Sequence, residues 1–208
     1  MSYFNNNFIK TNIEKEIGTG TINQPEYPCY FFYDYGYFAQ IYSQEELGFG
    51  RPVWIKGVRF RMDESGGQES VNNQTLKLGQ VNQVEFKSNV RNDMTQSPFV
   101  DFSTSNITTV KSNFTWTIFN IGAVWKEIIF DTPFLYDPTI TNKHLLLVWE
   151  NRDGSYTSGS TSPWSECSTS GSLARSYYDY QDNSMPNTTD YGTADSTGRP
   201  NAQFIIEV

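Results

Sequence analysis

Short segments in which apolar and polar residues alternate constrain the fold of this chain most strongly. Residues 53–62 (VWIKGVRFRM) place Arg59 and Arg61 on one parity. On the other parity, four apolar residues share one face: Trp54, Val58, Phe60 and Met62. Because side chains alternate between the two faces of a strand, this pattern predicts a β-strand with one buried face.

Four further segments carry strand patterns: 75–81, 125–134, 144–150 and 202–208. In the first, Leu76 and Leu78 are predicted to point inward. The second is expected to stop at Pro133, which cannot donate to a ladder. The third (HLLLVWE) is apolar on both parities, which indicates a central strand covered on both faces. The segments between the strands are rich in Ser, Thr, Asn, Asp and Gly, and the longest of them, 151–172 and 181–201, are expected to be loops.

Residues 29–48 (CYFFYDYGYFAQIYSQEELG) concentrate aromatic side chains. Neither parity is polar, so we expect two short strands or a bend around Asp34–Gly36. The Phe side chains are predicted to line the sandwich, which leaves the Tyr hydroxyls around the bend for contact with a ligand. The stretch ends in a single helical turn, 43–47, closed by Gly48.

Strand segments at this spacing, with turn residues between them, predict an all-β fold built as an antiparallel β-sandwich. A chain of 208 residues is long enough for one such domain. No break in composition marks a second domain, and the chain shows no internal repeat.

Bulk composition argues against several classes of partner. A formal net charge of -8 disfavours nucleic acid, whose phosphates must be neutralised by Lys and Arg. No apolar run approaches the ~20 residues of a membrane helix, so no membrane partner is expected. The cysteines, Cys29 and Cys167, form no CxxC pattern, and whether they pair is left open. Residues 1–18 lack the pattern of a signal peptide, so we expect folding in a cytoplasm.

Several short motifs occur together in a characteristic order. They are 17–21 (IGTGT), 39–42 (AQIY), 45–48 (EELG), 75–79 (TLKLG), 131–134 (DTPF), 145–159 (LLLVWENRDGSYTSG), 177–180 (YYDY) and 199–208 (RPNAQFIIEV). Together they resemble the jelly-roll-like β-sandwich modules repeated in large surface proteins of Bacteroidetes. The resemblance covers about residues 17–208 and implies a jelly-roll-like sandwich domain there, preceded by an N-terminal arm, residues 1–16. The segment 82–113 is more irregular than in those modules.

The modules of that family belong to long secreted proteins, and this chain is short and starts without an export signal. A single unsecreted copy fits a bacteriophage of such bacteria that carries the module on its virion. We therefore expect a structural or adhesive virion protein, at the head, tail or a fibre. Its partners would be other virion proteins, in a homo- or hetero-oligomer, and a host surface glycan. The alternative is a glycan-binding module or glycan-active enzyme domain at the bacterial cell surface.

The sequence predicts no enzyme and assigns no catalytic residue. Its single histidine, His144, opens the most apolar strand, where a side chain bonded to the backbone is expected rather than a member of a catalytic triad. Paired carboxylates of a glycosidase are an alternative, but acidic loop residues usually form turns. The available acids are Asp34, Asp63, Glu64, Glu150, Asp153, Asp179 and Asp182.

No cofactor is expected. One structural Ca²⁺ remains open, because sandwich loops offer hard oxygen ligands, although no DxDxDG loop identifies them. Carbohydrate binding is the more attractive prediction, since sugars stack on exposed aromatic rings and bond to polar side chains nearby. The candidate ligand-binding residues are the aromatic residues of the polar loops: Tyr156, Trp164, Tyr177, Tyr178 and Tyr191.

The N-terminal arm carries apolar side chains that a free terminus does not need. Docking of this arm on a neighbouring subunit, or folding back onto its own domain, would bury them. The candidate docking residues are Tyr3, Phe4, Phe8 and Ile9.

Overall fold

A computed structural model of the chain describes residues 11–63, 69–87, 90–92, 94, 107–118, 123–141, 143–156, 164–169 and 171–207. These residues form one short helix, α1 (Gln44–Leu47), and strands β1 (Asn12–Ile17), β2 (Ile22–Gln24), β3 (Tyr35–Tyr42), β4 (Val53–Met62), β5 (Glu69–Val81), β6 (Thr108–Ile118), β7 (Val124–Tyr136), β8 (His144–Asn151), β9 (Ser165–Ser168), β10 (Ser176–Gln181), β11 (Thr193–Asp195), β12 (Arg199–Pro200) and β13 (Ala202–Glu207).

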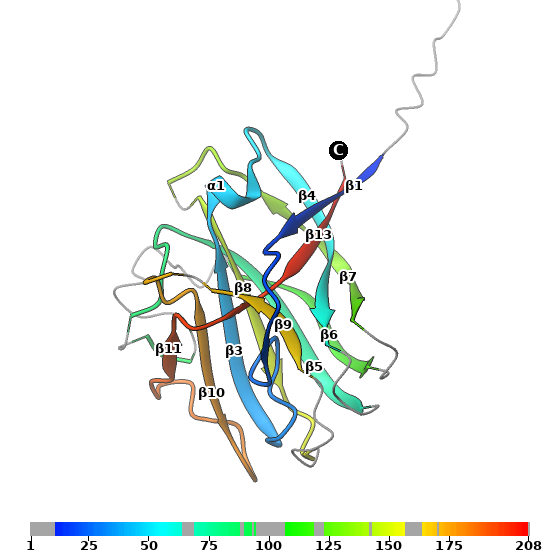
Figure 1. Cartoon of the computed structure of the whole chain (residues 1–208), viewed down its shortest axis with the longest axis vertical. Coiled ribbons are helices and arrows are strands. Elements are labelled where there is room, and N and C mark those ends of the chain that lie inside the picture. Colours follow the sequence, from blue (N-terminus) through cyan, green and yellow to red (C-terminus); the bar gives the residue numbers. More distant parts are fainter. Residues whose placement is uncertain are drawn as a thin grey trace, which may run out of the picture.

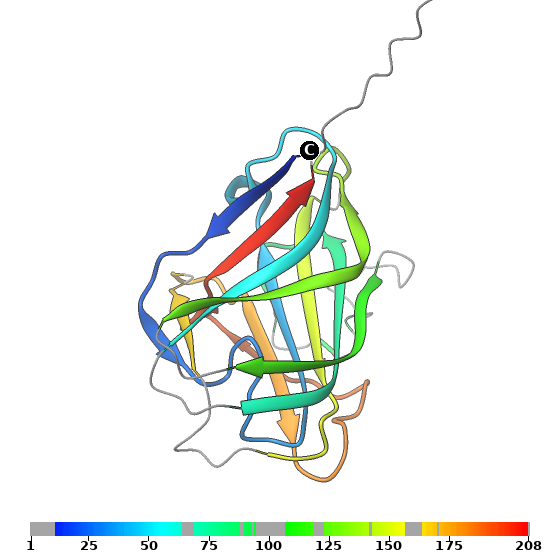
Figure 2. The same ribbon diagram turned by 90° about the vertical axis from the view of Figure 1, so that its right-hand side faces the viewer.

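The strands build two packed antiparallel sheets, which confirms the predicted all-β sandwich (Figures 1 and 2). One sheet has the order β11-β10-β3-β8-β5-β6. The other runs β1-β13-β4-β9-β12, with β2 paired to β9 and β7 paired to β4. Sequence-distant strands lie side by side: β1 pairs with β13 along its whole length.

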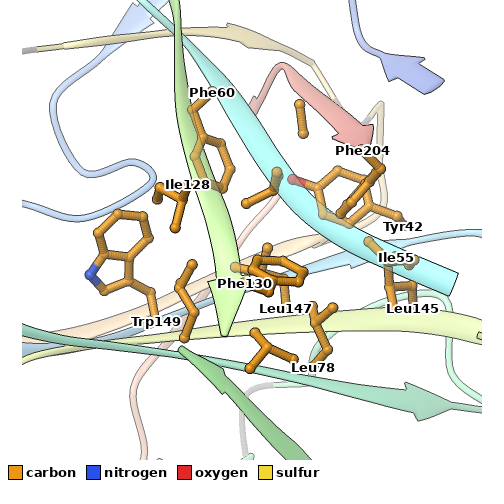
Figure 3. Packing of buried hydrophobic residues seen from close by; sticks show 14 of the residues in the cluster. Tyr42, Ile55, Phe60, Leu78, Ile128, Phe130, Leu145, Leu147, Trp149 and Phe204 are labelled. Carbon is orange, nitrogen blue, oxygen red and sulfur yellow. The ribbon is translucent and has the colours of Figure 1, made fainter. Parts of the chain in front are cut away.

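The main core fills the space between the sheets. Trp149 of β8 packs against Phe60 of β4 with ring centroids 6.0 Å apart, and Tyr42 of β3 meets Phe204 of β13 at 5.0 Å (Figure 3). All four side chains are fully buried. Burying one such side chain contributes about 1.5–3 kcal/mol, so contacts of this kind hold the two sheets together.

A second cluster covers the other face of the six-stranded sheet. Ala39 and Ile41 of β3 and Leu146 and Val148 of β8 pack there against residues of the segment after β5, including Phe86. The sheet is therefore buried on both faces at its centre. This confirms the interpretation of 144–150 as a central, doubly covered strand.

Local order differs from the predictions in several places, the first of them on β4. The register between β4 and β7 shifts between Ile55 and Gly57, so Trp54 points outward instead of sharing a face with Val58. An extra residue in one strand reverses the parity of everything beyond it. The prediction that Trp54 is buried with Val58 was therefore wrong.

The second difference concerns Pro133, because β7 continues past it to Tyr136. Residues 130–133 lie opposite the single residue Lys56, so the missing N–H of the proline interrupts no regular ladder.

The third difference is that the predicted loops 151–172 and 181–201 contain the short strands β9, β11 and β12. Residues 29–48 match the second of the two alternatives, the bend: turns precede Tyr35, where the single strand β3 begins. Phe31 and Phe38 are buried there as predicted, whereas Phe32 is exposed.

The predicted N-terminal arm, residues 1–16, is described in part. Residues 12–16 belong to β1 and pair with β13, so this part of the arm is a strand of the sandwich. The docking candidates Tyr3, Phe4, Phe8 and Ile9 lie outside the described residues.

The predicted helical turn is α1, and it anchors a charged network between the sheets. Ser43 and Glu46 form a capping box, and Gly48 ends the helix at φ 70°. The Glu46 carboxylate accepts hydrogen bonds from Arg199 of β12 at 2.6 and 3.0 Å and pairs with Arg175 at 2.7 Å. Arg199 is buried, donates to the carbonyl of Ile41 and lies over the ring of Tyr42.

Glu46 gives the fold a defined acid sensitivity. Burial opposes ionisation of this carboxyl, but the hydrogen bonds and charge of Arg199, the Ser43 amide and Arg175 outweigh it and lower its pKa to about 2. Because the pKa is lower in the folded state, the ionised carboxylate stabilises the fold above pH ~4.5, and that contribution is lost as the pH falls toward 2.

We expect Glu46→Gln to lower the free energy of unfolding at pH 7 by about 3–5 kcal/mol, because it leaves buried guanidinium charge without its partner. The deficit should shrink as the pH falls from 4.5 toward 2, where the wild-type carboxyl also becomes neutral. Urea unfolding of both proteins between pH 2 and pH 7 measures this. A deficit that does not depend on pH would contradict the assignment.

Candidate binding surface

Aromatic side chains gather at one end of the sandwich, where β3 begins and β10 ends. We call this group the aromatic end cluster and define it as Tyr30, Phe32, Tyr33, Tyr156 and Tyr180. Three segments contribute to it: the turns before β3, the loop after β8, and β10. In this cluster, aromatic rings contact one another and some of them are accessible to solvent.

The rings of the cluster contact one another in a chain. Tyr33 and Tyr180 are closest, with centroids 4.2 Å apart, and Tyr30 meets Tyr180 edge-on at 5.0 Å. Phe32 lies 5.9 Å from Tyr30 and 6.3 Å from Tyr156. Phe32 is 37% exposed and Tyr156 is 65% exposed, while the other three rings are half-buried. The arrangement is thus two accessible rings backed by three supporting ones.

Backbone hydrogen bonds fix the segments that carry these rings. The carbonyl of Asp34 accepts from the amide of Gly154 at 3.1 Å, and the side chain of Asn151 donates to the carbonyl of Tyr33. Gly154 adopts φ +74°, and a Cβ there would approach the Tyr35 hydroxyl to 3.1 Å. Glycine is therefore the residue that permits this close approach of the loop to β3.

Carboxylates lie beside and beneath the cluster. Tyr27 donates from its hydroxyl to Asp195 at 2.7 Å, and Tyr178 packs edge-on to Tyr27. Burial raises the pKa of Glu26, and the nearby Asp195 adds to the effect. Burial likewise raises the pKa of Tyr180 to about 12, helped by the neighbouring tyrosines and Glu26. The hydroxyl of Tyr180 consequently remains protonated at neutral pH.

The structure separates the five loop residues that the sequence suggested as ligand contacts. Tyr156 belongs to the aromatic end cluster, and Tyr178 stacks on Tyr180 beneath it at 5.4 Å. Trp164 is 36% exposed and precedes β9 in the other sheet. Tyr191 is 53% exposed, and its backbone forms an isolated β-bridge with Arg91.

Tyr177 is a correction to that set. It is fully buried in the second core cluster, where its hydroxyl donates to Val90 and Asn92 and accepts from the amide of Gly192. The alternation within β10 explains the difference, since adjacent Tyr177 and Tyr178 must face opposite sides of the sheet.

Four members of the cluster lie outside the predicted set of five loop residues: Tyr30, Phe32, Tyr33 and Tyr180. For the first three the signal was the density of aromatic residues in 29–48, which we assigned mainly to the sandwich wall, with the Tyr hydroxyls around the bend left for contact. A turn before β3 places Phe32 outside that wall, and residue parity cannot be read across a turn.

The residues considered for catalysis are engaged in structural contacts. His144 is buried, and its Nδ1 accepts from the backbone amide of Gln44 at 3.1 Å, as expected for a side chain bonded to the backbone. Burial lowers the pKa of His144. Glu150, also buried, forms ion pairs with Lys77 and Arg152.

The other acids of the predicted set mostly accept local hydrogen bonds. Asp153 accepts from the amide of Asn72 at 2.7 Å, and Asp179 accepts from Asn92. Glu64 lies outside the described residues.

Cys29 and Cys167 are both buried free thiols, so the open question of their pairing is answered for this structure. Within the described ranges, no group of three or more His, Cys, Asp or Glu side chains is arranged to hold a metal ion. In the part of the chain that the structure describes, no helix is long and apolar enough to cross a membrane.

No protein-family model matches the chain, and no curated protein matches its sequence. Among solved structures, it is similar to the crystal structure of the cysteine protease and lectin-like domains of Cwp84, a surface layer associated protein of Clostridium difficile. That similarity covers 84% of this chain and 32% of the other, at 9% identity and a TM-score of 0.40. At this level it carries no information on activity or ligand.

The raised pKa of Glu26 makes a testable statement about stability. Since the folded state favours the protonated carboxyl, stability is lost as the pH rises through its titration. We expect Glu26→Gln to raise the melting temperature at pH 7 and to leave it nearly unchanged at pH 3.5. The exposed Glu16 provides a control through Glu16→Gln. Differential scanning calorimetry at both pH values measures the effect; a lower melting temperature for Glu26→Gln at pH 7 would contradict it.

Proposed function

We propose that the protein is a non-enzymatic adhesion module that binds glycans through the aromatic end cluster. The observation that carries this proposal is the adjacent pair of accessible rings, Phe32 and Tyr156, backed by Tyr30, Tyr33 and Tyr180. Sugar rings present apolar C–H faces that pack on aromatic rings, while polar groups nearby bind their hydroxyls. Because backbone hydrogen bonds hold the segments in place, little ordering cost would oppose binding.

The charges around the cluster favour a neutral or basic glycan. Asp34 and Asp153 lie in the segments that carry the exposed rings, and Glu26 and Asp195 lie below them. The whole chain has a formal net charge of -8. An acidic sugar would be repelled by this field, whereas hydroxyl and amino groups find acceptors in it.

A non-enzymatic role is supported by the state of two catalytic candidates, His144 and Glu150. The histidine is buried against the backbone of α1, and Glu150 is held between two cations. Groups engaged in this way are poorly placed to transfer protons to a ligand at the aromatic end cluster.

Removing either exposed ring should weaken glycan binding. We expect Phe32→Ala and Tyr156→Ala each to raise the Kd about tenfold, which corresponds to a loss of about 1.4 kcal/mol of binding free energy. A glycan microarray of neutral, amino and acidic oligosaccharides would select the ligand, and isothermal titration calorimetry would then measure the Kd of each variant.

Tyr191→Ala is the matched control, because Tyr191 is an exposed tyrosine outside the cluster. Its Kd should equal that of the wild type. An equal loss for Tyr191→Ala, or binding of acidic glycans alone, would contradict the proposed site.

The biological setting that we propose is the virion of a bacteriophage, where the module would act as a structural and adhesive component. Its support is the ordered set of motifs between residues 17 and 208 that resembles modules of Bacteroidetes surface proteins. Mass spectrometry of purified virions should detect this chain. Its absence from the particles would favour the alternative, a glycan-binding module of the bacterial cell surface.

A further inference from the structure

The outward face of the seven-stranded sheet exposes large apolar side chains. Figure 2 shows β1 (blue), β13 (red), β4 (cyan) and β7 (green) side by side on this face. We define the outer apolar patch as Trp54, Ile129 and Leu135. They are 45%, 48% and 46% exposed, respectively. Exposed apolar groups of this size on neighbouring strands indicate a contact surface.

The strand register places the members of the patch on neighbouring strands of one face. Trp54 of β4 lies opposite Leu135 of β7, and Gly57 lies between Ile129 and Ile205. A Cβ at Gly57 would approach the Cδ1 atoms of Ile205 and Ile129 to 3.0 and 3.2 Å. The side chains of Ile129 and Ile205 thus occupy the space that a side chain at position 57 would need.

A β-bulge turns the largest member of the patch outward. Without the register shift between Ile55 and Gly57, Trp54 would share the inner face with Val58. Bulges commonly re-aim a side chain where a protein uses it. The exposure of Trp54 is therefore built into the strand and does not result from a shortage of core space.

Charged pairs border the patch. Lys56 pairs with Glu207 beside Trp54, and Arg59 pairs with both Glu14 and Glu127 near Ile129. Two shallow hollows lie on this face, one lined by Trp54, Lys56 and Pro133 and the other by Arg59, Glu127 and Ile129, among others. An apolar centre with a paired polar rim is the composition of a protein interface.

The chain itself supplies a segment with matching chemistry. Residues 1–10 contain Tyr3, Phe4, Phe8 and Ile9, and their only charged side chain is Lys10. The strand that follows them begins beside the patch, because Asn12 lies opposite Glu207, which in turn lies opposite Trp54. Ten extended residues reach up to about 33 Å. Leu135 is three strands from Asn12, or about 14 Å, so the segment is long enough to cover the patch.

The direction of β1 favours the patch of another molecule. Asn12, the first residue of β1, pairs with the last residue of β13, so the preceding chain leaves the sheet at its end. Residues 8–11 contain neither Gly nor Pro, the residues that most readily reverse a chain. A segment that leaves at the end of the sheet is placed to reach a second copy.

We propose that the outer apolar patch binds residues 1–10 of a second copy of this chain, so that the protein forms a homo-oligomer by exchanging N-terminal arms. A twofold arrangement lets each copy give its arm and receive its partner's in equivalent contacts. This interface is separate from the aromatic end cluster, so the oligomer would present several glycan-binding ends together.

Size-exclusion chromatography with light scattering tests the proposal on the full chain. The wild type should be an oligomer, whereas Trp54→Ser and a chain lacking residues 1–10 should both be monomers. Ile140→Ser is the matched control, since Ile140 is also 45% exposed but lies in the turn after β7. It should leave the oligomer intact, and thermal melts should show that all variants are folded.

A mixing experiment distinguishes arm exchange from contact of each arm with its own sheet. Trp54→Ser retains its arm and the shortened chain retains its patch, so the two should form a mixed complex although each alone is monomeric. A monomeric wild type, an oligomer that survives either change, or absence of the mixed complex would overturn the proposal. Glycan binding by the monomeric variants is expected to persist and is measured separately.

Discussion

The carboxylate of Glu46 connects the two sheets of this protein. It stands in the single turn that follows β3 and binds Arg199 of β12 in the opposite sheet. Arg175, directly before β10, pairs with the same carboxylate. A charge removed from water is tolerated only when several donors replace its hydration, and here two guanidinium groups and the Ser43 amide do so. The apolar core then packs around a fixed relative position of the sheets.

Burial of both faces of the six-stranded sheet decides where the molecule can make contacts. The segment after β5 covers one face and the seven-stranded sheet covers the other. Among the described residues, exposed apolar side chains gather at the aromatic end cluster, carried by turns, and on the outer face of the seven-stranded sheet. The first offers isolated rings among polar groups and suits a small polar ligand. The second is a broad sheet face and suits a polypeptide segment.

The sequence predicted the regular parts of the fold well. The strand at 53–62 has the same bounds in the structure, and Leu76, Leu78 and the strand at 144–150 are buried as expected. Its failures have specific physical causes. Trp54 was assigned to the wrong face because a bulge changes parity without leaving a signal in composition. The strands β9 and β12 were missed because they are too short for alternation to be recognised.

The binding surface was predicted in part. Tyr156 was identified from its polar loop, whereas Tyr177 proved to be buried, and Phe32 was expected in the core but is exposed. Which aromatic residue reaches solvent depends on the turn before β3 and on the strand that pairs with β10, and neither is encoded in the local pattern.

By itself, the sequence determined that this chain forms an antiparallel sandwich with acidic, aromatic-rich loops, because period-two alternation and turn residues are local properties. Only the tertiary structure decided which aromatic rings gather at one end and which apolar residues remain on the outer face. Those outcomes depend on pairing between strands far apart in the chain, such as β1 with β13. They also depend on one-residue register shifts, whose effect exists only when the partner strand is in place.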